Sequence, residues 1–572
     1  MIDDMHSLVT HESAPSAEVS PAGALTRALT FLREDQRDGA HWAGVLSSSA
    51  LATAMSIVAL HATDANGYAE QIALGRDWLL ATQADDGGWG DAVVDSANIN
   101  ATSLALGALA YTQAGRPDAA TVETRRRGET RLAGFGGWGA VGDPNRCTLS
   151  GPCRTVAALA GILDWRRIKR LRPEVIYLPA PIRRTISTTY PAYLSIAMLH
   201  AATAPHTLNR LPTYAGACRR AMEWLGRAQG PNGSFEESAF LTSVIITCMT
   251  ASGHSDLPWL PAAIRFVAAS QREDGGWPID RDLETFDTDM SVFAFAAAGE
   301  PTPGAESVRS WLLARQFTAR CFPTGARPGG WAWAMPAGWP DSDDTAYTLL
   351  ALRALGVPAE SGALRRGARW LEGMQCSNGG WSTFVRNSSM PFDHDCPYVT
   401  GHALSALHAV GRLGERPRTL ERALGYLRRA QRYDGSFASI WFREATAGTA
   451  SVLEALADCD LLDLPMATRA SDYLLRSQND DGGWAGLRMT ASTAEETSWA
   501  VMALLRWPSN DAVANAIRRG VGWLAKEQRP DGTWTPAPIG LYYSAMWYSD
   551  SYYAVTLPAQ ALARARAAYD WA

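Results

Sequence analysis

A short motif that recurs along these 572 residues constrains the fold of the chain more than any other feature. Each clear copy starts with Gln, passes through an Asp-Gly or Asn-Gly turn and ends with Trp six positions later, at 83–89, 271–277, 375–381, 478–484 and 528–534. Weaker copies lie at 36–42, 229–235 and 431–437, and a degenerate Gly-Gly-Trp lies at 136–138. Where neighbouring copies are clear, they lie 42 to 56 residues apart, which is a period typical of stacked supersecondary units.

Each copy of the motif predicts a pair of helices. The apolar-periodic stretch 366–374 reads as a helix ending at Gln375, and a second Ala/Leu-rich helix is expected over 400–410. Gly supplies the positive φ of a helix exit, the Gln amide can bond backbone groups at a neighbouring helix end, and the Trp ring can cover them. Because alternating β-branched runs are scarce, we predict an all-α fold built from (α/α) barrels, and because the chain exceeds one ordinary core, we expect two or more domains.

Three carboxyl groups crowd into the segment Asp341–Asp344, between Pro340 and an apolar helix predicted over 347–355. Crowded carboxyl groups do not all ionise near neutral pH, so one of them tends to keep its proton and can act as a Brønsted acid. The alternative is an ordinary helix N-cap, since Asp and Ser are preferred there and acidic residues suit the positive end of a helix dipole. The motif alone leaves both interpretations open.

The bulk composition narrows the remaining function classes. A net charge of −6 gives no support for a nucleic-acid partner, which usually selects a basic surface. The eight cysteines form no CxxC pair, so a reduced cytoplasmic protein is expected. No apolar run reaches the ~18 residues of a membrane span, while peripheral (monotopic) contact with a membrane stays open. Residues 1–21 are polar and read as a disordered lead-in.

The repeats, taken together with the run Asp-Ser-Asp-Asp-Thr-Ala at 341–346, resemble the class II terpene cyclases of the squalene–hopene cyclase type over about residues 25–562. This resemblance implies two (α/α) barrels with the active site between them. Residues 22–45 and 301–572 would form the catalytic barrel that carries the acid. Residues 46–300 would form an inserted second barrel.

The resemblance also assigns roles to single residues. Asp343 would donate the proton, with Asp341 and Asp344 as charge neighbours. His402, in Val-Thr-Gly-His at 399–402, would hydrogen-bond the acid; without the resemblance it reads as a core histidine. Aromatic ring faces stabilise carbocations without quenching them, and the matching wall positions are Phe286, Trp333, Trp441, Tyr542, Trp547 and Tyr548. Ordinary core packing is the alternative for each of these rings.

The implied activity is cyclisation of a linear isoprenoid polyene such as squalene, started by protonation and needing no organic cofactor. Several positions depart from the squalene enzymes and predict a reshaped cavity. The stretch 51–55 lacks a Glu, Ile186 with nearby Tyr190 replaces a cavity Trp, and Ala447 precedes Gly448 where Tyr is expected. Arg443 and Glu444 place charge after Trp441 where the squalene enzymes are uncharged.

Three alternatives stay open at this point. A cyclase of a prenyl diphosphate would use the same acid and would need cations and usually Mg²⁺; Arg443 and the clusters 125–127 and 166–172 are candidates, although such clusters are usually solvated. A protein prenyltransferase β-subunit would hold zinc, for example with Asp395, Cys396 and His394 or His402. A carbohydrate-active barrel is suggested by the 22 Trp residues. The sequence does not indicate an oligomeric state.

Overall fold

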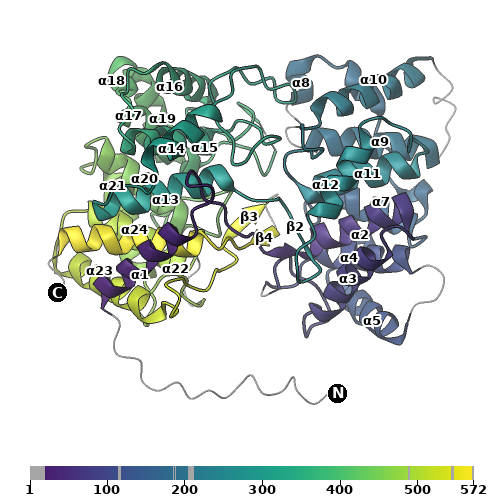
Figure 1. Cartoon of the computed structure of the whole chain (residues 1–572), viewed down its shortest axis with the longest axis horizontal. Coiled ribbons are helices and arrows are strands. Elements are labelled where there is room, and N and C mark those ends of the chain that lie inside the picture. Colours follow the sequence, from purple (N-terminus) through teal and green to yellow (C-terminus); the bar gives the residue numbers. More distant parts are fainter. Residues whose placement is uncertain are drawn as a thin grey trace.

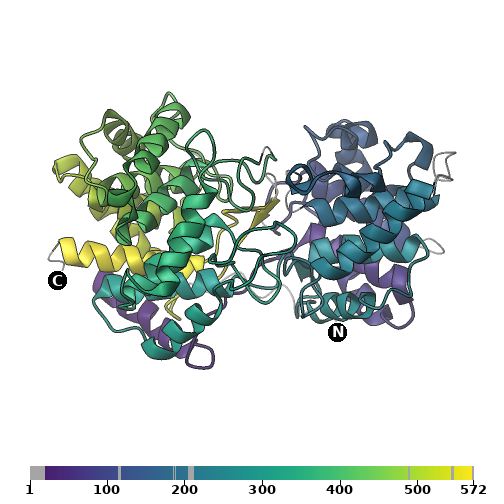
Figure 2. The same cartoon turned by 90° about the horizontal axis from the view of Figure 1, so that it is seen from above.

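The computed structural model of this protein describes residues 20–569 except for 94, 114–117, 185, 187–188, 204–211, 389, 487–489 and 543–545. Two helical barrels lie side by side, joined by irregular segments and short strands (Figures 1 and 2). We call them the C-terminal barrel and the inserted barrel. The predicted all-α class is confirmed.

Six inner helices close the C-terminal barrel, because the last of them contacts the first. They are α13 (Glu284–Ala298), α15 (Ser342–Ala354), α17 (Pro397–Ala409), α20 (Thr446–Asp458), α22 (Ala494–Arg506) and α24 (Tyr553–Ala568). The remaining helices of this barrel are α1 (Pro21–Glu34), α14 (Ala305–Ala314), α16 (Gly362–Met374), α18 (Arg412–Glu415), α19 (Pro417–Ala430), α21 (Pro465–Ser477) and α23 (Asp511–Glu527). Helix α1 is the first helix of the described chain, yet it packs against α24.

Five inner helices form the inserted barrel, and its ring closes where α11 contacts α2. They are α2 (Ala50–Asp64), α4 (Ile99–Thr112), α7 (Ser150–Leu159), α9 (Tyr190–Thr203) and α11 (Ala239–Ala251). Around them lie α3 (Ala69–Ala81), α5 (Ala119–Gly134), α6 (Gly137–Val141), α8 (Ala180–Arg184), α10 (Pro212–Ala228), α12 (Leu260–Ala269) and the 3₁₀ turns Trp165–Arg167 and Pro173–Tyr177.

Sequence pattern separates inner from outer helices. Residues 99–110 of inner helix α4 are all buried, and they are mostly Ala, Leu and small polar residues. Outer helix α19 buries only Ala423, Tyr426 and Leu427 and carries charged residues on the rest of its surface. A helix enclosed on all sides must be apolar or small all round, whereas a covering helix needs only one apolar stripe.

Helix α13 lies in a different barrel from the one we expected. The predicted boundary at residue 300 would place it in the inserted barrel. Instead it packs between α15 and α24, and its Phe286 and Met290 belong to the core of the C-terminal barrel. The change of barrel therefore falls just before Glu284, because α13 is the helix that completes the inner ring.

Sheet structure is minor and lies between the barrels (Figure 1). Strand β1 (Ser48–Ser49) pairs antiparallel with β2 (Trp277–Pro278), with Ser48 opposite Pro278. Strand β3 (Gly540–Tyr542) pairs antiparallel with β4 (Met546–Tyr548), with Leu541 opposite Trp547.

The repeated motif ties the helix pairs together through side-chain to backbone hydrogen bonds. Gln375 Nε2 donates to the carbonyl of Gly379 at 3.0 Å and to that of Thr419, in the first turn of α19, at 2.9 Å. Trp381 Nε1 donates to the Leu371 carbonyl at 2.8 Å. Gly379 has φ +104°, and a Cβ there would lie 2.2 Å from a backbone oxygen of α19, so only glycine fits. The other clear copies repeat both Gln bonds and the Trp bond.

The structure shows one such tie that the sequence analysis missed, and one predicted degenerate copy that does not form the tie. Gln316 donates to the carbonyls of Gly329 and Ala363, and Trp331 Nε1 donates to the Leu312 carbonyl, although Gln316 and Trp331 are fifteen positions apart rather than six. The longer spacing hid this copy from sequence reasoning. The degenerate copy at 136–138 instead enters the short helix α6, with Trp138 only half-buried.

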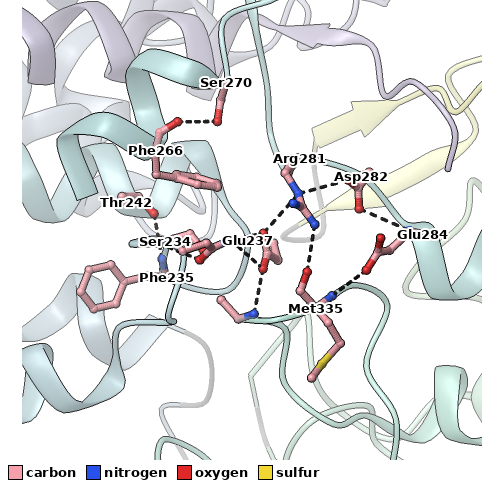
Figure 3. A network of polar contacts seen from close by, with 12 residues as sticks. Ser234, Phe235, Glu237, Thr242, Phe266, Ser270, Arg281, Asp282, Glu284 and Met335 are labelled. Atoms are coloured by element: carbon pink, nitrogen blue, oxygen red, sulfur yellow. Dashed lines mark hydrogen bonds and ion pairs between the residues drawn. The ribbon is translucent and has the colours of Figure 1, made fainter. Parts of the chain in front are cut away.

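A buried carboxylate links the two barrels (Figure 3). Glu237, from the segment before α11, accepts a hydrogen bond from the Ala337 backbone N–H at 2.7 Å and lies 3.5 Å from Nε of Arg281. Arg281 also donates to the Met335 carbonyl at 2.9 Å. These contacts anchor the loop that carries Trp333 and leads into α15 to the inserted barrel.

Candidate active site

The acidic segment sits at the N-terminus of α15, and Asp341 is its N-cap. Its Oδ1 accepts the backbone N–H groups of Asp343 and Asp344, both at 2.9 Å. The capping interpretation therefore holds for Asp341. Capping also turns the other two carboxyl groups inward, where all three are buried.

Asp343 pairs with the histidine from the neighbouring inner helix α17. His402 Nδ1 lies 2.6 Å from Asp343 Oδ1, and His402 Nε2 lies 3.1 Å from the hydroxyl of Tyr347. A neutral imidazole with its proton on Nδ1 satisfies both contacts, because it donates to the carboxyl and accepts from the tyrosine. The structure thus brings together two residues that are 59 positions apart in the chain.

The other two carboxyl groups retain protons well above the usual range for Asp. Burial, followed by the charge of Asp344, raises the pKa of Asp341 well above its ordinary value. Burial also raises the pKa of Asp344 to about 7, partly offset by a hydrogen bond from Asp341. A protonated Asp341 beside Asp344 leaves the segment with fewer charges than its three carboxyl groups suggest.

A cavity at the mouth of the C-terminal barrel opens onto these carboxyl groups, and aromatic side chains form most of its wall. Five of the six predicted wall aromatics line it, namely Phe286, Trp333, Trp441, Tyr542 and Tyr548. Sequence reasoning missed the other lining residues, which are Asp280, Leu283, Thr383, Phe384, Phe442 and Tyr553. No Arg or Lys among the described residues lines this cavity.

The wall rings contact one another and so hold their faces in place. Phe384 lies edge-on to Trp333 and to Trp441, with centroids 5.5 and 5.8 Å apart, and Phe442 lies 5.6 Å from Tyr553. Most of the missed residues share a position: like Trp333 and Trp441, they lie within a few residues after the Trp or Phe of a repeat copy. That common position was the signal available in the sequence.

Trp547 is the predicted wall residue that the structure leaves outside the cavity lining. It lies in strand β4 next to Tyr548, and successive side chains of a strand point to opposite faces. Since Tyr548 lines the cavity, Trp547 faces away from it.

The predicted cation candidates also lie away from this cavity. Arg443 pairs with the buried carboxylate of Glu496 at 2.9 Å. In the two surface clusters, Arg126 pairs with Glu123 and Arg172 pairs with Glu174. Their positions support the solvated interpretation of these clusters.

A second cavity reaches His402, the partner of Asp343, from inside the barrel. Its lining combines apolar side chains such as Met290 and Leu557 with Tyr347, His402 and the ion pairs Arg564–Glu454 and Arg506–Asp458. The Asp343–His402 pair therefore lies between the aromatic cavity and a cavity with polar groups, which is a suitable geometry for passing a proton from one to the other.

The zinc alternative finds no support in the residues that the structure describes, which hold no cluster of three or more His, Cys, Asp or Glu side chains placed to bind a metal. His402 is engaged with Asp343, and His394 Nδ1 lies 2.7 Å from the Asp395 carbonyl. Within the same part of the chain, no helix is long and apolar enough to cross a membrane.

Comparison with known proteins gives a consistent family. The squalene–hopene cyclase C-terminal and N-terminal domain models match residues 284–567 and 25–191, and the prenyltransferase alpha-alpha toroid model matches 173–323. The squalene–hopene cyclase of Alicyclobacillus acidocaldarius is 26% identical over 93% of this chain and 94% of its own length. That of Bradyrhizobium diazoefficiens is 32% identical over 44% of this chain and 43% of its own.

Among solved structures, ent-copalyl diphosphate synthase from Streptomyces platensis superposes with a TM-score of 0.61 at 19% identity, covering 95% of this chain and 98% of that one. This likeness concerns the fold. With the family models over both barrels, the repeat ties and the buried carboxyl segment, the chain belongs to the class II terpene cyclases, in the squalene–hopene cyclase family.

Proposed function

We propose that this enzyme cyclises a linear isoprenoid polyene and that Asp343 supplies the starting proton. The observation that carries the proposal is the contact of Asp343 with His402 at the edge of an aromatic cavity without lysine or arginine in its described lining. An acid held by a histidine from outside the cavity can protonate an alkene inside it, because the described cavity lining consists of rings, carboxyl groups, Leu283 and Thr383 and holds no basic side chain that would capture the proton.

The reaction begins when the Asp343 carboxyl proton adds to the terminal carbon–carbon double bond. The π electrons form the new C–H bond and leave a tertiary cation, which the next double bond attacks in a substrate held in a folded shape. Ring faces of Trp333, Phe384, Trp441 and Phe442 stabilise the moving charge by ~0.5–2 kcal/mol each. Proton loss or water capture ends the cascade. His402 and the second cavity behind it return a proton to Asp343.

The apolar lining makes an uncharged polyene of the squalene type the first candidate for the part of the substrate beside the acid. Cyclisation of a prenyl diphosphate with the diphosphate retained is the second candidate. A separate cavity that is lined by four arginines favours this second candidate.

The test of the acid is Asp343→Asn. We expect a folded protein without detectable cyclic product from squalene, farnesyl diphosphate or geranylgeranyl diphosphate, assayed by gas chromatography after phosphatase treatment. His402→Ala should keep the fold and slow turnover by about 10²–10⁴-fold, the range for lost general acid–base support. Wild-type turnover in a folded Asp343→Asn protein would refute the assignment.

Contact with a membrane surface is a further part of this proposal. Exposed apolar side chains gather just before and within α8, where Tyr177, Leu178 and Ile182 are 42%, 42% and 52% exposed. Arg183 and Arg184 follow directly, and basic residues beside apolar ones suit an anionic lipid surface. Sedimentation with phosphatidylglycerol vesicles should be reduced in a Leu178→Ser, Ile182→Ser double variant.

A further inference from the structure

A third cavity, which we call the arginine cavity, lies between the barrels. It is lined by four arginines, which are Arg183, Arg184, Arg227 and Arg320. The first three come from the inserted barrel, in α8 and α10, and Arg320 comes from the segment after α14 of the C-terminal barrel. The cavity volume is about 480 Å³, within the roughly 300–1,000 Å³ of small-molecule sites.

The positive charge of this cavity is not compensated by its described lining, which holds no Asp or Glu. None of the four arginines takes part in a salt bridge within the described chain. The Nε of Arg183 is buried without a hydrogen-bond partner. Four guanidinium groups that line one cavity without a carboxylate in its described lining indicate an anionic ligand.

Contacts with neighbouring residues fix the orientation of three of the guanidinium groups. Arg227 stacks 4.1 Å from the ring centroid of Phe322, and Arg320 Nη1 donates to the Gly325 carbonyl at 2.7 Å. The guanidinium of Arg184 packs over Gly325, where a Cβ would lie 2.0 Å from its Cζ. A guanidinium stacked on a ring keeps its N–H edge available for oxygen acceptors.

The same cavity offers an apolar wall for the rest of such a ligand. Trp224 lies edge-on to Tyr190 at 4.8 Å and contacts Phe322 at 5.6 Å, and Trp339 completes the wall. A ligand with a charged end and an apolar chain therefore fits better than a free inorganic anion.

The same two chain segments contribute residues to the arginine cavity and to the acid cavity. Phe384 lines the acid cavity and its chain neighbour Val385 lines the arginine cavity. Trp339, on the arginine side, is two residues before Asp341, on the acid side. One extended molecule passing this segment would reach both the arginines and the acid.

We propose that the arginine cavity binds the diphosphate group of a prenyl diphosphate substrate whose far double bond reaches Asp343. The inference rests on the proposed cyclase function and specifies its substrate class. The diphosphate stays bonded to its carbon, since the reaction begins at the other end. The cavity has no described carboxylate to hold Mg²⁺, so the donor set does not fit a protein-held metal, and the arginines neutralise the charge themselves.

Calorimetric titration of the full chain with inorganic pyrophosphate in Mg²⁺-free buffer tests the site. The variants are Arg184→Gln, Arg227→Gln and Arg320→Gln. The control is Arg365→Gln, which replaces an exposed arginine of α16. Arg227 and Arg320 are exposed, so their replacement leaves the fold intact. Each cavity variant should weaken binding about tenfold, the effect of one lost charge-assisted hydrogen bond, and the control should match wild type. Absent binding, or equal binding by all variants, overturns the proposal.

Turnover distinguishes the substrate from a lipid headgroup as the source of the phosphate. With geranylgeranyl or farnesyl diphosphate, Arg227→Gln should raise KM about tenfold and leave kcat near wild type. If the arginine variants change only binding to phosphatidylglycerol vesicles, the substrate assignment is wrong. Asp343→Asn with full activity would refute the acid while leaving the pyrophosphate result intact. If no variant or wild-type protein binds pyrophosphate and the arginine variants turn over squalene like wild type, the arginine cavity is not a diphosphate site, while the proposed cyclase function stands.

Discussion

Asp341 combines a structural and a chemical function in one side chain. As N-cap it fixes the first turn of α15, and as a buried carboxyl with a raised pKa it keeps a proton beside Asp344. The two interpretations of the acidic segment were therefore not exclusive. Capping by Asp341 is what leaves Asp343 free of the helix terminus and able to meet His402.

The two functions of Asp341 can be separated by substitution. Asp341→Asn keeps a capping oxygen, so its stability should stay near wild type, whereas Asp341→Ala should lose about 1 kcal/mol of unfolding free energy. Both should lose most cyclisation activity because the shared proton is gone. Urea unfolding and product analysis measure the two effects. Equal stability of the Asn and Ala variants would contradict the capping function.

The pH dependence of turnover should reflect Asp344. Below pH 7 this carboxyl is mostly protonated, because its pKa is raised to about 7. Above pH 7 it ionises, and proton transfer to the alkene would then leave two negative charges side by side in the acidic segment, which is unfavourable. We expect kcat to fall as pH rises through about 7. The Asp344→Asn variant, which cannot ionise, should lack this decline.

At the scale of elements, the repeated motif links one helix pair to the next through hydrogen bonds. The Gln amide bonds its own turn and the start of the following outer helix, and the Trp bonds the helix it follows. Gln316 does the same across its longer loop, and its Oε1 also accepts from Arg366 at 2.7 Å. That loop belongs to the connection that delivers Trp333 and Asp341 to the cavity.

The hidden copy should therefore matter as much as a clear one. Gln375→Leu removes two hydrogen bonds to backbone carbonyls, and Gln316→Leu removes the equivalent two and the one from Arg366; we expect each loss to cost about 1–3 kcal/mol. We expect similar decreases in the urea midpoint of the C-terminal barrel, followed by tryptophan fluorescence. Gln113→Leu, on a half-buried side chain outside the motif, is the control. An unchanged midpoint for Gln316→Leu would show that the long-spaced copy is not a tie.

At the scale of the whole molecule, buried carboxyl groups are spread over both barrels and the segment between them. Burial is the largest cause that raises the pKa of Asp91 to about 7, of Asp280 to about 7 and of Glu495 to about 8. Glu237, which holds the loop before α15, also has a raised pKa because of its burial. The assembly of the two barrels is thus coupled to protonation.

Stability should decrease as pH rises. A carboxyl whose pKa is raised in the folded state binds its proton more tightly there, so its stabilising contribution is full near pH 4 and is lost as pH rises through the folded pKa. The free energy of unfolding in urea should fall between pH 5 and pH 8. Asp91→Asn, which is far from the acid cavity, should make this decline shallower. A stability that increases over this range would contradict the raised pKa values.

The sequence by itself determined what depends on neighbours along the chain. The Gln-to-Trp motifs fixed the paired helices, since a turn glycine and the glutamine amide four residues before it act within one loop. The order of Asp341, Asp343 and Asp344 fixed the cap, because a helix start needs only a few consecutive residues, and it marked the segment as a candidate acid site.

Only the tertiary structure decided what depends on distant segments. It placed α13 in the C-terminal ring, turned Trp547 away while bringing Phe384 and Phe442 into the wall, and gathered arginines from two barrels into one cavity. Spacing along the chain carries no information about these contacts, because they arise where ring closure and packing bring helix ends together. The candidate acid segment was therefore visible in the local sequence, whereas the shape and charge of the cavities around it were not.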